Sequence, residues 1–393
     1  MRKTTIATVI LTIALLYILS PYMFEKYFFF NEILSATGFA ILLNKRLRVG
    51  NDAISIALVL LLSWCSIHAI TSLARMDALY FYLRNSVIMY SMFTFFIGFY
   101  LLKYLGPYIN KIRSGLRAFI ATFLLIPLPR VFFERYAVAM LFPALFKNSA
   151  SKWVPVLLIL LNIIYAITYK SSTSGVAAIF FTFLFLCPGY KFFSQTMVVI
   201  LVSFAVFFIY MHPYLALISY KWTFENQNPI FNVVRSHPLL AIDGNSTWRL
   251  VLWDQFLVDD FPANIFGLGF GTPAIKYYPV EDYSKLHTLP YVLGAHNAFI
   301  YLFARLGLPY IIFTFFIYAK VFKEYFYYKS YYFANNQVLI FWSFFASSLI
   351  ALFNPALETP LFAGGYWLVL GFTARAIYNR QKAIVPYESP VHS

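Results

Sequence analysis

Charged side chains are scarce in this chain. Asp, Glu, Lys and Arg make up 11% of its 393 residues, against about 25% in a typical soluble domain. Hydrophobic residues account for 61% of the chain, so a water-soluble fold of this length has too few polar residues to cover its apolar surface. The composition therefore excludes an ordinary soluble protein and predicts a protein embedded in lipid.

The chain also lacks the residues that build common metal, redox and nucleotide sites. Its two cysteines, Cys65 and Cys187, fall inside apolar runs and predict neither a disulfide nor a zinc site. No Walker loop, serine nucleophile motif or Asp-x-Asp metal motif is present, and Asp259-Asp260 and Glu281-Asp282 are adjacent pairs in a polar stretch. We therefore expect neither a metal nor a cofactor.

Long apolar runs dominate the sequence instead. They extend over about 16 to 23 residues, the length that a helix needs to cross the hydrocarbon core. Lipid offers no hydrogen bonds to the backbone, so these spans should be helices. We predict an all-α polytopic fold, one membrane domain over residues 1–393 with about twelve spans. The predicted spans are 5–23, 27–43, 53–71, 82–102, 116–129, 132–146, 153–169, 174–187, 192–211, 297–319, 337–353 and 360–378.

One long polar stretch interrupts this pattern. Residues 212–296 lie between the ninth and tenth predicted spans, and we expect them to form a large extracytoplasmic loop that contains short helices. Residues 379–393 are polar and predict a short cytoplasmic tail. Chemistry that requires polar groups has few other places in this chain.

The distribution of Lys and Arg predicts the orientation. If loops are assigned alternately to the two sides, eighteen Lys and Arg residues fall on the side of both termini and six in the short loops opposite. Basic residues favour the cytoplasmic side, so we predict cytoplasmic termini and an external large loop. The net charge of +15 then reflects membrane topology and contact with anionic membrane lipids, and we expect no nucleic-acid partner.

The large loop contains an arginine in an amphipathic segment. Asn245-Ser246-Thr247 predicts an N-cap before a helix of about twelve residues. Arg249 shares one face of this helix with Leu252 and Phe256, where a guanidinium is costly unless an anion meets it. That anion is either a structural partner, such as Asp254 or a lipid phosphate, or a substrate phosphate that the arginine fork fits.

Three glycines stand at alternate positions further along this loop. Gly267, Gly269 and Gly271 could turn backbone amides inward as an anion-binding nest. Their spacing is not that of a dinucleotide fingerprint, because no strand-to-helix unit surrounds them. A flexible turn is the other interpretation.

His296 and Asn297 stand where the loop re-enters the membrane. Asn297 is a natural N-cap for the next span, and the helix dipole disfavours a protonated imidazole beside it. A neutral His296 can accept a proton as a general base. Alternatively, it is an interfacial histidine that contacts only water and backbone.

Further ionisable residues fall near the outer ends of the spans. Arg305 follows His296 by nine positions, on the opposite face of that helix, which favours a structural ion-pair role. Glu358 could pair with one of the nearby cations. The candidates for substrate contact or pairing are Arg130, Arg135, Lys170, Arg305 and Glu358.

These fragments, taken in order, resemble the signature of the O-antigen ligase and O-antigen polymerase superfamily. The similarity covers roughly residues 118–378 and is strongest over 244–308. The fragments are Ser246-Thr-Trp-Arg249-Leu-Val-Leu-Trp253, Gly267-Leu-Gly-Phe-Gly271, His296-Asn297-Ala-Phe-Ile, Arg305-Leu-Gly307, Asn354-Pro-Ala-Leu-Glu358 and Trp367-Leu-Val-Leu-Gly371.

The resemblance implies a glycosyltransferase of the bacterial plasma membrane. Such enzymes move a glycan from undecaprenyl diphosphate to a saccharide acceptor at the outer face, without a metal and with inversion at the anomeric carbon. Arg249 matches the loop arginine that contacts the diphosphate, and His296 matches the histidine that deprotonates the acceptor hydroxyl. One departure stands out, because Ser174 occupies the place where many members carry a second arginine.

Three functions remain open from the sequence. The first is a ligase that attaches a finished polysaccharide to lipid A-core, and the second is a polymerase of O-antigen, capsule or exopolysaccharide. The third is a small-anion transporter, as some distant relatives are thought to be. Transport sites usually lie near the bilayer midplane among repeated halves, whereas here the polar residues gather at the outer side and no repeat is visible.

Overall fold

The computed structural model shows a protein built almost entirely of α-helices. The two short strands, β1 (Ile275–Lys276) and β2 (Tyr291–Val292), form one antiparallel pair in which Ile275 lies opposite Val292. The residues that the structure describes are 30–44, 53–105, 160, 163, 167, 172–224, 244–259, 265–273, 275–276, 291–292, 296–335, 337–353, 356–358 and 360–384.

The helices follow the apolar runs of the sequence. Their bounds are α3 (Phe30–Asn44), α4 (Ala53–Leu73), α5 (Leu79–Ser91), α6 (Thr94–Leu105), α10 (Ser172–Leu186), α11 (Tyr190–Phe224), α13 (Gly244–Asp254), α14 (Ala298–Tyr327), α15 (Lys329–Ala334), α16 (Val338–Phe353) and α17 (Pro360–Ile384). A π-helical turn, η4 (Gln255–Asp259), follows α13, and a 3-10 turn, η5 (Ala356–Glu358), joins α16 to α17.

Eight of the twelve predicted spans coincide with described helices: those at 27–43, 53–71, 82–102, 174–187, 192–211, 297–319, 337–353 and 360–378. The predicted spans at 5–23, 116–129 and 132–146, and nearly all of 153–169, lie outside the described residues. Four described helical segments are long and apolar enough to cross a membrane, namely Ala53–Leu73, Leu79–Lys103, Tyr190–Leu217 and Ala298–Tyr327. These features are those of an all-α membrane protein.

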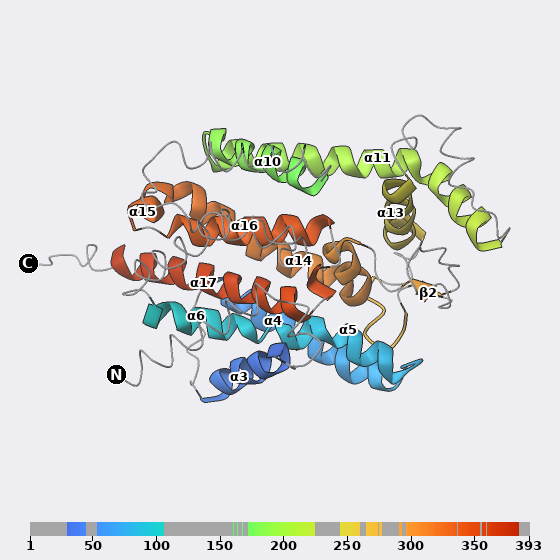
Figure 1. The fold of residues 1–393 in the computed structure, drawn as a ribbon, viewed down its shortest axis with the longest axis horizontal. Helices are drawn as coiled ribbons and strands as arrows, with labels where there is room; N and C mark the ends of the chain where they lie inside the picture. The colour runs from blue at the N-terminus through green and yellow to red at the C-terminus, as the bar shows by residue number, and fades with distance from the viewer. Residues whose placement is uncertain are drawn as a thin grey trace, which may run out of the picture.

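The described helices lie side by side along the long axis of the molecule (Figure 1). The most extensive packing joins α17 to α6, and α14 to α4. Glycines permit the first of these contacts, because a Cβ at Gly98 would overlap the Leu368 carbonyl oxygen and a Cβ at Gly371 the Phe95 carbonyl oxygen. Small residues that bring helix backbones together are typical of packing in membranes.

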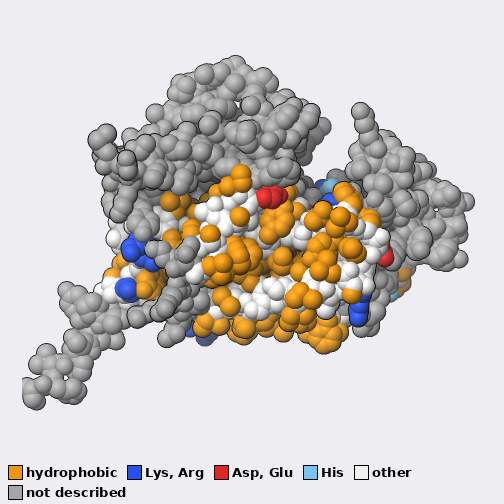
Figure 2. Space-filling model, turned by 90° about the horizontal axis from the view of Figure 1, so that it is seen from below, with side chains coloured by type: hydrophobic (Ala, Val, Ile, Leu, Met, Phe, Trp, Pro, Cys, Tyr) orange, Lys and Arg blue, Asp and Glu red, His pale blue; other side chains and the backbone are white. Residues whose placement is uncertain are grey.

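The surface of the helices is strongly apolar. On α11, Val198, Val199, Leu201 and Ile209 are all more than half exposed. Figure 2 shows a long face whose middle is covered by hydrophobic side chains, with Lys and Arg toward its ends. Such a surface is stable against hydrocarbon and unfavourable against water.

Candidate functional site

The predicted arginine helix is present as α13, which stands across the other helices at one end of the molecule (Figure 1). It begins at Gly244, so Asn245, Ser246 and Thr247 form its first turn and do not precede it as the predicted cap. Leu252 and Phe256 are buried, as the helix periodicity predicted.

Arg249 is half-buried on α13 and reaches the end of α16. Its Nη1 donates a hydrogen bond of 3.3 Å to the carbonyl oxygen of Phe353. Asp254, which the sequence suggested as a partner for Arg249, lies 2.9 Å from Nδ1 of His212 on α11. The sequence did not identify this His212–Asp254 pair, which joins α13 to α11.

The glycine-rich segment is a packed turn against a break in α14. At Gly307 the backbone leaves the helical region, with φ 69° and ψ −162°, two residues before Pro309. The amides of Leu268 and Gly269 donate to the Ala304 and Arg305 carbonyl oxygens, each at 2.9 Å. A broken helix in lipid needs such partners for its exposed backbone groups.

The next backbone amide of this turn also donates a hydrogen bond within the protein. The Phe270 N–H donates to Ser72 Oγ on α4 at 2.8 Å. Three successive amides therefore serve acceptors within the protein and are not available to an anion. These hydrogen bonds do not fit an open anion nest; the segment is a turn that packs against α4 and α14.

Close approach explains why glycines occupy this turn. Gly267 and Gly269 have φ values of 93° and 75°, which other residues rarely adopt. A Cβ at Gly267 would overlap the Arg305 carbonyl oxygen, and one at Gly269 would overlap Ser72 Oγ. A Cβ at Gly271 would stand 2.7 Å from Met76 Cα. All three positions therefore require a residue without a side chain.

Arg305 is fully buried and fixes this turn from α14. Its Nη1 donates to the Thr272 carbonyl oxygen at 2.6 Å and to that of Gly269 at 3.2 Å. The guanidinium also lies over the Tyr301 ring, 4.9 Å from its centroid. The sequence predicted a structural ion pair for Arg305, whereas the hydrogen-bond acceptors of its Nη1 are backbone carbonyls and not a carboxylate.

A second anchor comes from α5. Asn85 Nδ2 donates to the Phe270 carbonyl oxygen at 2.9 Å, and its Oδ1 accepts a 2.6 Å hydrogen bond from the Tyr301 hydroxyl. These bonds hold α5, α14 and the glycine turn together. They also place Arg84, the neighbour of Asn85 in the chain, at this end of the molecule.

Glu358 lies in η5 and is only 8% exposed. Among the described residues, Arg84 is the cation paired with it, and Arg84 Nη2 lies 3.7 Å from Glu358 Oε2, beyond hydrogen-bond distance. The sequence suggested one of Arg130, Arg135 and Arg305 as its partner; the structure pairs it with Arg84 instead, and Arg130 and Arg135 lie outside the described residues. Burial raises the pKa of Glu358 to about 8, against the opposing effect of the positive charges of Arg84 and Arg305.

Asn297 caps α14 as predicted. Its Oδ1 accepts hydrogen bonds from the Phe299 and Ile300 amides at 3.0 and 3.1 Å. His296, directly before it, has φ 50°, a left-handed conformation that residues other than glycine and asparagine adopt infrequently. Such strain often marks a functional position.

The predicted site residues are thus distributed as follows. Arg249, His296, Asn297, Glu358 and the three glycines all belong to segments at one end of the molecule (Figure 1). Arg130, Arg135 and Lys170 lie outside the described residues. Within the described part of the chain, no three His, Cys, Asp or Glu side chains are grouped as a metal site would require.

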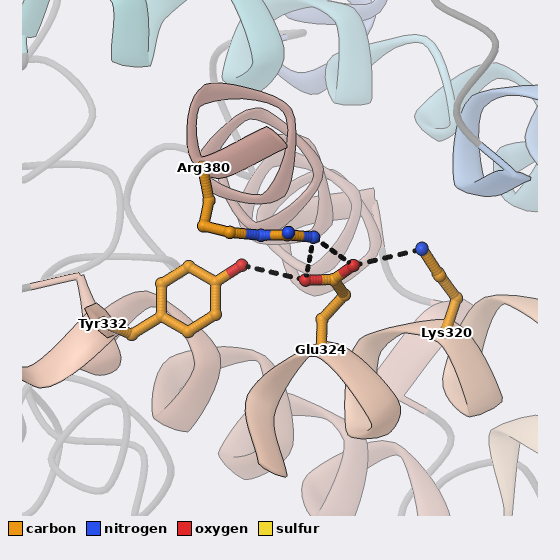
Figure 3. A network of polar contacts seen from close by, with 4 residues as sticks. All are labelled: Lys320, Glu324, Tyr332 and Arg380. Carbon is orange, nitrogen blue, oxygen red and sulfur yellow. Dashed lines mark hydrogen bonds and ion pairs between the residues drawn. The ribbon is translucent and has the colours of Figure 1, made fainter. Parts of the chain in front are cut away.

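The opposite end carries a buried ionic cluster that the sequence did not reveal. Arg380 Nη2 lies 2.6 and 2.7 Å from the two carboxylate oxygens of Glu324, which also meets Lys320 Nζ at 3.1 Å and the Tyr332 hydroxyl at 3.3 Å (Figure 3). These residues join α14, α15 and α17. They are far from α13 along α14 and belong to the packing of the helices.

The chain was also compared with known proteins. No family model, curated protein or solved structure matches it.

Proposed function

We propose that this chain is an O-antigen ligase-like glycosyltransferase of the bacterial plasma membrane. It moves a polysaccharide from undecaprenyl diphosphate to a saccharide acceptor, lipid A-core, without a metal and with inversion. In this proposal the chain has about twelve spans, both termini are cytoplasmic and residues 212–296 form a periplasmic loop. Two observations at one end of this all-α membrane protein carry the proposal. Arg249 is half-buried on α13, and His296 has a strained backbone directly before the capped helix α14.

Each side chain has a chemical task. The Arg249 guanidinium binds the donor diphosphate and stabilises the negative charge that this leaving group gains. His296 takes the proton of the acceptor hydroxyl as its oxygen forms a bond to the anomeric carbon. The bond from that carbon to the diphosphate oxygen breaks, and its electron pair leaves with undecaprenyl diphosphate.

A polymerase of the same superfamily is the second candidate, because the same two residues would serve it. Transport of a small anion has one supporting observation, the break of α14 at Gly307, since transporters bind ions at broken helices. The break is, however, filled by the glycine turn, and the Arg305 guanidinium beside it donates to carbonyls of that turn. These contacts argue against an ion site at the break in α14.

Deletion of the gene, followed by gel analysis of surface polysaccharide, tests the proposal. A ligase predicts long chains that remain on the lipid carrier, whereas a polymerase predicts acceptor that carries a single repeat unit. A normal ladder together with impaired anion uptake would contradict both.

Complementation with variants tests the two assigned roles. Arg249→Ala and His296→Ala should each abolish most transfer while the protein reaches the membrane in normal amounts. Arg75→Ala is the matched control, because Arg75 is exposed in the connection from α4 to α5 at the same end. Wild-type transfer by the Arg249 or His296 variant removes that residue from the mechanism.

A further inference from the structure

Glu358 combines deep burial with unused hydrogen-bonding capacity. Neither of its carboxylate oxygens accepts a hydrogen bond from the residues that the structure describes, although its side chain is only 5% exposed. An ionised carboxylate in such a place is costly, because it has lost water without gaining donors. The uncharged acid is therefore favoured at this position.

Arg84, the cation beside Glu358, is more exposed than the carboxylate. Its side chain is 27% exposed, whereas that of Glu358 is 5% exposed, so Arg84 is the member of the pair that solvent can reach. The separation of 3.7 Å makes the pair an electrostatic contact and not a bidentate hydrogen bond. When Glu358 is protonated, it contributes no negative charge against Arg84.

The other elements packed against η5 add mainly positive charge. They are α5, α14, α16 and α17. Arg305 and Tyr301 of α14 and Arg84 of α5 act electrostatically in this group, while α16 contains no ionisable residue. The first ionisable side chain of α17 is Tyr366. Within the described part of the chain, Glu358 is thus a carboxylate that lies within the electrostatic influence of two arginines.

We propose that Arg84 is an anion-binding residue and that Glu358 is its proton-controlled counter-ion. With Glu358 protonated, Arg84 attracts an anion from the surface; with Glu358 ionised, the charge of Arg84 is balanced and this attraction is weakened. The anion is the diphosphate of the lipid-linked donor, an identity that rests on the proposed function.

The position of Arg249 supports this identity. Arg249 contacts the Phe353 carbonyl oxygen, and Arg84 contacts Glu358 on the same connection between α16 and α17. These two points are five residues apart, so their separation along the chain is at most about 18 Å, and the 3-10 turn shortens it. A donor headgroup with two phosphates and sugars can therefore lie against both arginines.

Direct binding to the purified full-length protein in detergent tests the proposal. The probes are undecaprenyl diphosphate, inorganic pyrophosphate and phosphatidylglycerol, and the measurement is Kd at pH 7 and pH 9. A phosphate ester completes its second ionisation near pH 6, so the charge of the lipid diphosphate changes little over this interval. A change in Kd between pH 7 and pH 9 then reflects a change in the charge of the protein and not of the lipid diphosphate.

The expected results separate the two residues. Wild-type protein should bind undecaprenyl diphosphate about tenfold more weakly at pH 9 than at pH 7, whereas Glu358→Gln should bind with high affinity at both. Arg84→Gln should weaken binding at pH 7 by about tenfold and remove the dependence on pH. The matched controls Arg75→Gln and Asp77→Asn, both exposed at the same end, should behave as wild type.

Several results would overturn the proposal. They are an unchanged Kd in Arg84→Gln, a wild-type pH dependence in Glu358→Gln, or no binding of either diphosphate by wild-type protein. Tighter binding of phosphatidylglycerol than of undecaprenyl diphosphate would assign the site to a lipid headgroup and overturn the donor identity. Tighter binding of pyrophosphate than of the lipid diphosphate would likewise assign it to a free anion.

These failures are distinguishable from failure of the proposed function. If binding follows the expected pattern but gene deletion leaves the polysaccharide ladder intact, the anion site stands and glycan transfer is wrong. If deletion abolishes the ladder but the Arg84 and Glu358 variants bind as wild type, only the anion site is wrong.

Discussion

His296 combines backbone strain with its proposed chemical role. Its φ of 50° costs about 1 kcal/mol or more in a histidine, whereas asparagine and glycine tolerate this conformation. We predict that His296→Asn keeps the thermal stability of wild type, that His296→Val lowers it, and that both lose glycan transfer. Melting in detergent and surface-polysaccharide gels measure the two effects. A more stable valine variant would show that the conformation is not strained.

Glu358 should make the stability of the protein depend on pH. Its pKa is raised to about 8 in the folded protein from about 4.5 in the unfolded chain. Between these values the folded state binds more protons, so stability falls as pH rises and is lowest above pH 8. We predict that Glu358→Gln loses less stability than wild type between pH 6 and pH 9, by about 1 kcal/mol or more. Equal slopes in melting temperature against pH for the two proteins would refute this.

Local residue features were predictable from sequence, and partners distant in the chain were not. The Asn297 cap depends on amides two and three positions away, so its sequence signal was sufficient. The partners of Glu358 and Asp254 are Arg84 and His212, on helices whose neighbours only the folded chain determines. Composition and charge gave no way to choose among many possible pairs.

At the scale of helices, the contact between α6 and α17 depends on glycines that face the partner backbone. Gly371 meets Phe95 and Phe99 of α6, whereas a Cβ at Gly365 of the same helix has no atom within 4 Å. We predict that Gly371→Ala destabilises the protein by a few kcal/mol, as overpacking does. Gly365→Ala, the matched control, should be neutral or stabilising because alanine favours helix. Equal melting temperatures for the two variants would contradict the close packing.

Helix positions were largely predictable, because each described span is a long apolar run. The interruption of α14 also had a signal, since Gly307 and Pro309 weaken a helix. The sequence carries no signal for the segment that packs into this break, which is the glycine turn of residues 267–271. Alternate glycines at 267, 269 and 271 suggested an anion nest or a flexible turn, and their close approach to Arg305 and Ser72 depends on helices that only the folded chain brings together.

The ionic cluster at the far end of α14 should contribute stability without affecting transfer. Loss of the Glu324 charge leaves Arg380 buried without its carboxylate, which costs about 3 to 5 kcal/mol in comparable cases. We predict that Glu324→Gln lowers the melting temperature while glycan transfer per folded molecule stays at the wild-type level. Transfer that falls more steeply than the amount of folded protein would place this cluster in the function.

At the scale of the whole molecule, charge divides the two ends. The end that holds the Glu324 cluster also carries Lys103, Lys191, Lys320, Lys323, Lys329, Arg375, Arg380 and Lys382. Glu324 is the one acidic residue among the described residues at these helix ends. Basic residues favour the cytoplasmic side, so we expect this end inside and the end with α13, Arg249 and His296 outside.

Labelling with a membrane-impermeant maleimide in intact cells measures this orientation. Asp77 and Asn335 are exposed at opposite ends, and the natural cysteines Cys65 and Cys187 are buried, which keeps the background low. We predict that Asp77→Cys reacts in intact cells and that Asn335→Cys reacts only after the membrane is opened. The reverse pattern would place Arg249 and His296 in the cytoplasm. Glycan transfer at the outer face would then be impossible for this site, whatever the chemistry of its side chains.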